Sequence, residues 1–309
     1  MKILVIGGSG HIGKFLTPML VERGDEVVVA SRGITAVPDT DAWSKADLRQ
    51  ATYARDDAVW GEFVAGVGAE TVIDIVGTDI PGTYEASARC GCKHLVACGS
   101  LWMFGPPRVV PTPPQRQNAC EFSGYALRYE EILATQKKAG AGDGPAFSAI
   151  MPPNICGPYK IPLDCYGGRS AELHKAHMQG RPVKLPAGCN TLIGPCDAED
   201  IAWAFMLATE HRDAAAGEIF NVGSAYSLAA PQFVEAYGQI YGVEIPVEYV
   251  SQAEYYSAVL PDLGANYHFR SHMLPDISKL CSRLGYEPRH TPEQTLRRAV
   301  DWMRQQGLI

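Results

Sequence analysis

The chain opens with Lys2-Ile3-Leu4-Val5-Ile6-Gly7-Gly8-Ser9-Gly10-His11-Ile12-Gly13, and this stretch decides its fold. The first five residues, four of them branched and apolar, predict a buried parallel strand. The glycines then lead into residues 14–23, whose pattern predicts an amphipathic helix. A strand, a glycine-rich turn and a helix in this order indicate a dinucleotide-binding site.

Each of the three glycines in this turn has a separate structural role. Gly7 permits the tight turn, Gly10 lets the backbone approach a pyrophosphate, and Gly13 lets the helix pack closely on the strand. The phosphates would bind the free N–H groups at the helix N-terminus, where the dipole favours negative charge. His11 and Ile12 lie within this turn, and we assign them to the same cofactor site.

The end of the second predicted strand, residues 26–31, bears on the choice of cofactor. An acidic residue about 20 positions after the glycines would bind the ribose 2′-hydroxyl of NAD. Ser31 and Arg32 stand there instead, and an arginine suits the 2′-phosphate of NADP. We therefore expect NADP, with NAD as the alternative. Asp47 and Leu48 are placed after a third strand and are expected to meet the adenine ring.

Strands and helices alternate through the first half of the chain. The pattern predicts strands at 70–77, 94–98 and 146–151 and helices at 83–90 and 124–139. This alternation predicts an α/β fold, a Rossmann-type doubly wound parallel sheet with a smaller, mainly C-terminal substrate lobe. Val76 and Gly77 end one of these strands, where a small residue lets the backbone pass close to a cofactor.

The alternation breaks near residue 159, which sets the predicted domain limits. We assign 1–158 to the dinucleotide-binding domain, 159–190 to the first part of the substrate lobe, 191–225 to a return into the first domain, and 226–309 mainly to the lobe with a C-terminal helix. Residues 152–158 predict a rigid turn. A capping box, Thr291 with Gln294, starts the last helix.

Composition excludes several classes of protein. The 309 residues carry a formal net charge of −7, which disfavours a broad nucleic-acid-binding surface. No apolar run has the length of a membrane span. The nine cysteines have no metal-binding spacing, so we expect reduced thiols, a cytoplasmic location and no metal. His174 and His177 are expected on the surface of a helix.

The ordered motifs resemble the extended short-chain dehydrogenase/reductase family, the NAD(P)-dependent epimerase and dehydratase group. They cover nearly the whole chain in the family's order. The motifs are Gly7-x-x-Gly10-x-x-Gly13, Cys98-Gly99-Ser100 with Phe104-Gly105, Pro153-Asn154-x-x-Gly157-Pro158, Asp197-x-x-Asp200-Ile201-Ala202, Phe220-Asn221-Val222-Gly223, Asp276-Ile277-Ser278-Lys279 and Leu284-Gly285-Tyr286-Glu287-Pro288.

The resemblance implies three catalytic positions, and the chain matches two of them. Ser100 stands where the family's Ser or Thr binds the substrate oxygen, and Tyr125 where its tyrosine moves the proton. Tyr129 occupies the position of the lysine that holds the nicotinamide ribose and assists that tyrosine. Three interpretations follow: a cation such as Arg128, Arg169 or Arg270 replaces the lysine, the proton chemistry differs, or turnover is lost.

The resemblance also suggests substrate contacts. Asn154 of the Pro-Asn turn is a candidate for substrate phosphates, although an asparagine there equally suits a purely structural role in the turn. Pro152 and Asn154 are also assigned to the cofactor site. Arg169 and Arg270 are candidates for a diphosphate, and Trp102 for an apolar pocket wall.

We therefore predict an NAD(P)-dependent oxidoreductase or epimerase that acts by hydride transfer on a sugar-like hydroxyl or carbonyl compound such as a nucleotide-sugar. The alternative is a catalytically silent dinucleotide-binding protein that acts as a sensor or partner. An RNA-binding relative is a third and least favoured interpretation. The family's helices at 83–90 and 124–139 commonly form a dimer interface, which implies a homodimer.

Overall fold

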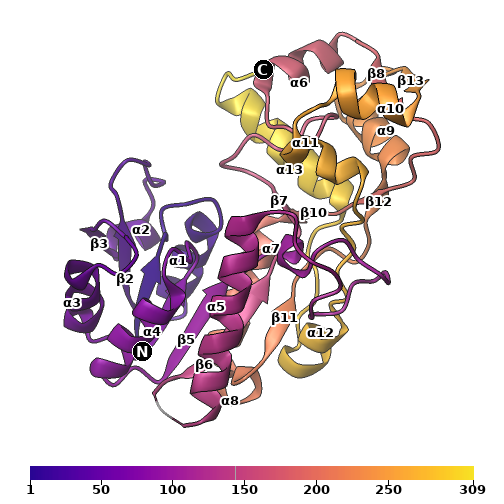
Figure 1. Cartoon of the computed structure of the whole chain (residues 1–309). Helices are drawn as coiled ribbons and strands as arrows, with labels where there is room; N and C mark the ends of the chain where they lie inside the picture. The colour runs from indigo at the N-terminus through magenta and orange to yellow at the C-terminus, as the bar shows by residue number, and fades with distance from the viewer. Residues whose placement is uncertain (143) are drawn as a thin grey trace.

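A parallel sheet of seven strands forms the centre of the larger half of the molecule (Figure 1). The computed structural model describes residues 1–142 and 144–309. The strands follow the order β11-β6-β5-β4-β1-β2-β3. Their bounds are β1 (Lys2–Ile6), β2 (Glu26–Ser31), β3 (Asp47–Gln50), β4 (Thr71–Asp74), β5 (His94–Cys98), β6 (Ala146–Met151) and β11 (Ile219–Asn221).

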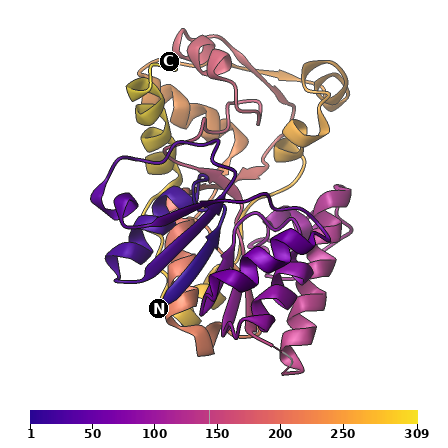
Figure 2. The same ribbon diagram turned by 90° about the vertical axis from the view of Figure 1, so that its left-hand side faces the viewer.

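Helices cover both faces of this sheet, as Figure 2 shows from the side. One face packs against α1 (Gly13–Glu22), α2 (Asp41–Ser44), α7 (Ala198–Glu210), α8 (Arg212–Ala215) and α12 (Ser278–Leu284). The other packs against α3 (Ala58–Val67), α4 (Ile80–Arg89) and α5 (Ser123–Gly140). Covered on both faces, the central strands are almost entirely apolar and buried. The predicted doubly wound sheet is confirmed.

The smaller half, at the top right of Figure 1, has its own apolar core, formed by buried side chains. The strands β8 (Val183–Pro186) and β13 (Val247–Val250) pair in parallel, and β9 (Leu192–Ile193) pairs antiparallel with β12 (Leu228–Ala229). Its longer helices are α6 (Ala171–Met178), α9 (Ala230–Tyr241) and α13 (Pro292–Gln305), and its shorter ones are α10 (Gln252–Glu254) and α11 (Leu263–Asn266). Short 3₁₀ or π-helical segments are η1 (Leu101–Phe104), which belongs to the larger half, η2 (Tyr255–Val259) and η3 (Tyr267–Phe269).

A small parallel pair lies where the two halves meet. It joins β7 (Asn154–Cys156) to β10 (Pro195–Asp197). The sequence predicted only a rigid turn at residues 152–158. Three residues are too few to show a strand period, and their partners lie 41 residues further along, so this prediction was incomplete.

Two buried histidines correct another expectation. His174 and His177 on α6 are almost completely buried, whereas the sequence predicted a surface face. His174 Nδ1 lies 2.6 Å from the hydroxyl of Tyr241 on α9, so α6 turns its histidines toward the core of the smaller half. Spacing alone does not reveal which face of a short helix has a neighbour.

The capping box of α13 is present as predicted. Thr291 accepts a hydrogen bond from the Gln294 N–H, and the Gln294 side chain accepts one from the Thr291 N–H. Across residues 1–142 and 144–309, the structure contains no helix that is both long and apolar enough to cross a membrane.

Candidate active site

Two cavities lie side by side at the carboxyl edge of the central sheet, and Ile75 lines both. The glycine-loop cavity, about 470 Å³, lies over the ends of β1, β2 and β4. The junction cavity, about 550 Å³, lies between the ends of β5 and β6 and the smaller half. Ligand sites in doubly wound sheets form at this edge.

The glycine turn has the tight turn predicted at Gly7 and the close packing predicted at Gly13. Gly7 adopts a left-handed φ of +84°, and a Cβ there would lie 2.7 Å from Val76 Cγ2. A Cβ at Gly10 would lie 3.1 Å from the Gly7 carbonyl oxygen. At Gly13 it would lie 2.2 Å from the Gly8 carbonyl oxygen, which is impossible without moving the backbone. The turn therefore depends on glycine where α1 approaches β1.

The N-terminus of α1 presents unused donors. Among the described residues, no protein acceptor binds the backbone N–H of His11, Ile12 or Gly13. Three adjacent N–H groups at the start of a helix form a site for a phosphate. The glycine cradle and these donors fit the pyrophosphate of a dinucleotide.

Ser31 and Arg32 line the glycine-loop cavity, but Asp47 and Leu48 do not. The latter two begin β3 instead of following it, and they pair with Val28 and Val29, short of the carboxyl edge. Asp47 forms an ion pair with Arg49. Their assignment to adenine is therefore not supported, because the third strand starts later than the sequence suggested.

Tyr53 and Trp60 line the wall where adenine was expected, and the sequence analysis missed both. Their rings stack with centroids 4.3 Å apart. The Tyr53 hydroxyl donates to Asp74 Oδ2 at 2.7 Å, and Asp74 Oδ1 accepts from the N–H groups of Val76 and Gly77. Burial raises the pKa of Asp74. This buried carboxyl thus shapes the turn that borders both cavities.

Ser100 and Tyr125 both line the junction cavity, from the end of β5 and the first turn of α5. Trp102 and Pro152 line it too. The Trp102 ring lies 5.8 Å from that of Tyr125, edge to face, so the apolar wall predicted from Trp102 is adjacent to the tyrosine.

Tyr129 does not line this cavity. It is buried, with its ring edge to face with Phe104 at 5.4 Å and with the Arg116 guanidinium 4.9 Å above it. Burial raises the pKa of Tyr129. The catalytic assignment of Tyr129 is therefore not supported by its position, which is part of the packing between α5 and the loop before it.

Arg128 lines the cavity beside Tyr125 and Ser100. Its side chain reaches Gly77, where an added Cβ would lie 3.2 Å from Arg128 Nε. Among the described residues, no hydrogen bond or ion pair engages its guanidinium. Arg128 thus places a cation in the junction cavity. It lies one position before Tyr129, which occupies the position of the family's lysine.

The other predicted substrate residues fall into two groups. Arg169 lines the junction cavity, and its guanidinium donates to the carbonyls of Ile161 and Ile155 at 2.6 and 2.7 Å. Arg270 lies outside the junction cavity and lines a separate one. Its guanidinium Nη1 lies 3.6 Å from Glu121 Oε2.

Asn154 lines the junction cavity, but both ends of its amide have protein partners. Its Oδ1 accepts from the Gly194 N–H at 3.1 Å, and its Nδ2 lies 3.1 Å from His268 Nδ1. The structural role that the sequence left open for Asn154 is therefore present, and its contact with a substrate phosphate stays a prediction.

Lys160 and His268 complete the cavity and were not singled out from the sequence. Burial and Arg169 lower the pKa of Lys160, and burial with Arg169 lowers the pKa of His268 to about 4. His11, whose pKa burial lowers to about 3, faces the same cavity. Lys160 follows the Gly157-Pro158 motif by two residues, a signal that would have found it, whereas His268 lies in a weakly patterned region.

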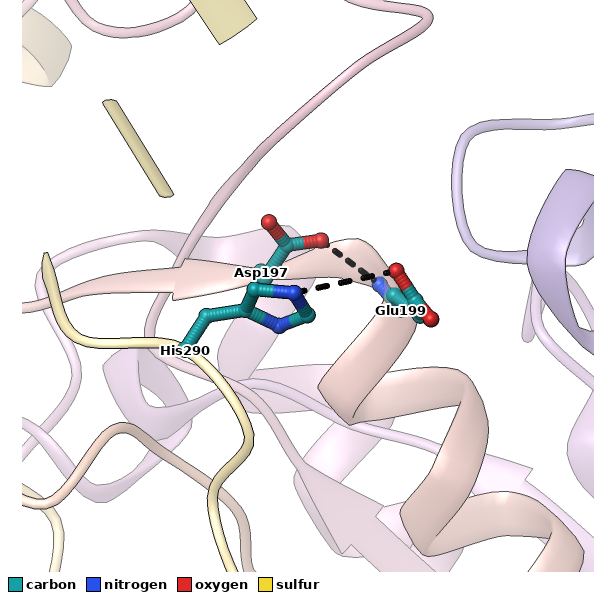
Figure 3. Close-up of side chains that lie close together, drawn as sticks. All are labelled: Asp197, Glu199 and His290. Atoms are coloured by element: carbon teal, nitrogen blue, oxygen red, sulfur yellow. Dashed lines mark hydrogen bonds and ion pairs between the residues drawn. The ribbon is translucent and has the colours of Figure 1, made fainter. Parts of the chain in front are cut away.

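A separate cluster at the start of α7 brings Asp197, Glu199 and His290 together (Figure 3). Potential ligand atoms of the three lie within 4.8 Å of one another. Arg298 already forms ion pairs with both carboxylates, and His290 Nδ1 lies 3.2 Å from Asp200 Oδ1. The cluster therefore joins α7 to α13 through ion pairs.

Comparisons with known proteins agree with this geometry. The model of the NAD dependent epimerase/dehydratase family matches residues 3–223. A UDP-glucose 4-epimerase of Corynebacterium glutamicum is 25% identical over an alignment of 337 positions. The alignment covers 96% of this chain and 93% of the relative. An uncharacterized chloroplastic protein of Arabidopsis thaliana is 26% identical, covering 69% of this chain and 72% of its own length.

Solved structures share the fold. The UDP-glucose 4-epimerase of Thermotoga maritima, solved with UDP-glucose, has a TM-score of 0.76 at 20% identity, covering 99% of each chain. That of Bifidobacterium longum, in complex with NAD⁺ and UDP, has a TM-score of 0.75 at 15% identity, covering 100% of this chain and 99% of its own. The resemblance and the enzyme class inferred from the motifs are confirmed: this chain belongs to the NAD dependent epimerase/dehydratase family.

Proposed function

We propose that this protein is an NADP- or NAD-dependent epimerase or oxidoreductase that acts on a nucleotide-sugar by hydride transfer. The observation that carries the proposal is the junction cavity, which combines Ser100, Tyr125 and Arg128 next to the unused donors of the glycine turn. A bound dinucleotide supplies the hydride acceptor and donor at this edge of the sheet. The chain supplies the groups that hold the substrate and move its proton.

In this proposal Ser100 and Tyr125 act on the reacting oxygen. The Ser100 hydroxyl orients the oxygen, and the Tyr125 phenol takes up or returns its proton. Arg128 supplies the positive charge that stabilises the phenolate and so assumes the electrostatic role of the absent lysine. An arginine stays charged throughout, so it assists as a fixed cation and does not carry the proton itself.

The charge of the junction cavity favours an anionic substrate. Arg128, Lys160 and Arg169 line it, and no aspartate or glutamate among the described residues does so. This contrasts with the net charge of −7 for the whole chain. The Corynebacterium glutamicum relative named above is a UDP-glucose 4-epimerase, and a sugar diphosphate would give an acceptor to Arg128, whose guanidinium has no protein partner among the described residues.

We propose NADP as the preferred cofactor because Arg32 borders the glycine-loop cavity. Its guanidinium suits a 2′-phosphate, and the sequence offers no acidic residue at that strand end for the 2′-hydroxyl of NAD. Replacing Arg32 by Asp should reverse the preference, which titration with both cofactors measures.

We also propose a cytoplasmic homodimer that associates through α4 and α5. These helices lie side by side on one face of the sheet, joined by an ion pair between Lys138 and Glu85. Leu127 on α5 exposes about half of its side chain, 53%. The nine cysteines are all free thiols, which fits a reducing compartment.

The deciding experiment is turnover of a panel of UDP-sugars by the wild-type protein and by Tyr125→Phe, each loaded with NADP or NAD. An enzyme should convert at least one sugar and lose about 100-fold or more of kcat with the phenylalanine. A protein that binds cofactor but converts no UDP-sugar would instead be the silent dinucleotide-binding protein.

A further inference from the structure

His268 lies in the junction cavity but is not used by the chemistry described above. It is only 5% exposed and belongs to the 3₁₀ segment η3. The ring packs edge to face with Trp102 at 5.1 Å. On another side, a Cβ at Gly167 would lie 2.7 Å from His268 Cδ2, so the backbone of the loop at Gly167 packs directly against the ring. The imidazole is held in one place.

Its hydrogen bonds also fix which ring nitrogen carries the proton. The backbone N–H of Gly194 can only donate, so the Asn154 atom that it contacts at 3.1 Å must be the oxygen. The other end of the amide, Asn154 Nδ2, therefore faces His268 Nδ1 at 3.1 Å. An amide nitrogen can only donate, so Nδ1 must accept.

A histidine whose Nδ1 accepts is neutral and carries its hydrogen on Nε2. Burial and the neighbouring Arg169 act in the same direction, since both lower the pKa of His268. Among the described residues, no protein group binds His268 Nε2. This nitrogen is also absent from the fully buried polar atoms that lack a hydrogen-bond partner, so it is accessible. Nε2–H is thus a donor open to the junction cavity.

We propose that His268 is a specificity-determining residue whose Nε2–H donates a hydrogen bond to an oxygen of the substrate's sugar. The position beside Trp102, whose ring also contacts Tyr125, places this donor at the reacting end of the cavity. Asn154 is a positioning residue, since it acts through His268. This inference rests on the proposed function and deepens it, by assigning the sugar an acceptor oxygen that the site requires.

The tautomer tests the donor directly, without a substrate. In ¹⁵N spectra of histidine-labelled protein at neutral pH, we expect the His268 signals, assigned by their loss in His268→Phe, to show hydrogen on Nε2. Asn154→Asp keeps an oxygen for Gly194 but replaces the donating amide nitrogen with a second acceptor. It should move the hydrogen to Nδ1 and convert Nε2 into an acceptor.

Kinetics with UDP-glucose and its 2-, 3- and 6-deoxy analogues test the role. His268→Phe should raise KM for UDP-glucose about tenfold, the effect of one lost hydrogen bond, with cofactor affinity unchanged. His268→Gln, whose amide places a donor near the same point, should recover part of the loss. Asn154→Asp should behave like His268→Phe. The penalty of His268→Phe should disappear for the one analogue that lacks the acceptor oxygen.

Other outcomes separate the failures. Hydrogen on Nδ1 in the wild type, or an equal penalty on UDP-glucose and on all three analogues, would overturn the role of His268 and leave the proposed function standing. Wild-type protein that converts no UDP-sugar would overturn the proposed function and this inference with it.

Discussion

Tyr125, Arg128 and Tyr129 lie within one turn of α5, yet their side chains have different neighbours. Residues three and four positions after Tyr125 both lie near its face of a helix. Arg128 reaches the junction cavity and Gly77, whereas Tyr129 packs under Arg116 and Phe104. A motif fixes which position to inspect, but the packing around the helix decides which side chain reaches the cavity.

Arg128→Met tests whether this cation assists Tyr125. It keeps the length of the side chain and removes the charge, so we expect kcat to fall by about 100-fold. Arg128→Lys should retain more activity than Arg128→Met because it retains the charge. Lys137→Met, at an exposed position of the same helix, is the matched control. Equal kcat for the wild type and Arg128→Met would exclude the assigned role.

Tyr129→Lys tests the motif itself. The family's lysine would here enter a buried site beside Arg116, whose guanidinium already pairs with Glu130. We expect no gain in turnover and a loss of about 2–3 kcal/mol in the free energy of unfolding. Tyr129→Phe preserves the packing and should cost about 1 kcal/mol or less, as denaturant unfolding would show. Higher turnover in Tyr129→Lys would mean that position 129 reaches the substrate.

At the scale of elements, the sequence predicted those parts whose signal is local. The βα units that begin with β1, β4 and β5, and the capped α13, follow from apolar periodicity and caps. The strand β7 could not be predicted because its partner β10 is distant in the chain. The start of β3 was misplaced for a similar reason, since its register depends on β2.

The turn between β1 and α1 is the element most sensitive to a single methyl group. A Cβ at Gly13 would collide with the Gly8 carbonyl at 2.2 Å. Gly13→Ala should therefore weaken NADP binding about 10- to 100-fold, since relieving such overpacking costs about 1–3 kcal/mol. Gly66→Ala in α3 meets nothing within 4 Å and should leave binding unchanged. Isothermal titration compares the two, and equal affinities would contradict the close packing.

The contact of His290, in the segment before α13, with the start of α7 makes stability depend on pH (Figure 3). The hydrogen bond to Asp200 raises the pKa of His290 above its usual 6.5, and Asp197 also raises it, while burial and Arg298 oppose the shift. A raised pKa in the folded state stabilises the protein fully below pH 6.5, and this contribution disappears as the pH rises through the folded value. His290→Gln should therefore lower the free energy of unfolding more at pH 6 than at pH 9.

Denaturant unfolding at the two pH values measures this difference. His211→Gln, at an exposed position just after α7, controls for the loss of a histidine as such. An effect of His290→Gln that is the same at pH 6 and pH 9 would show that the ion pair with Asp200 does not form.

At the scale of the whole molecule, the candidate site is shared between the two halves. Ser100 and Tyr125 come from the sheet and its helix, whereas Arg169 and His268 come from the smaller half. The family resemblance located the first group, because Ser100 follows a recognisable strand and Tyr125 begins a recognisable helix. It missed His268 because that residue reaches the cavity through contacts with Asn154 and Trp102, which no spacing encodes.

The proposed dimer would place α5, the helix that carries Tyr125 and Arg128, at the interface. Leu127 lies between these two residues and faces outward. A glutamate in its place would put two like charges near the symmetry axis of a twofold interface and leave them without water, so Leu127→Glu should shift the protein toward monomers. Tyr249→Glu, at an exposed position of β13 in the smaller half, should not. Sedimentation velocity distinguishes the two variants, and a wild-type protein that stays monomeric at micromolar concentration would exclude the dimer.

A dimeric wild type whose Leu127→Glu form is monomeric, with reduced kcat, would mean that the interface also holds α5 in its active position.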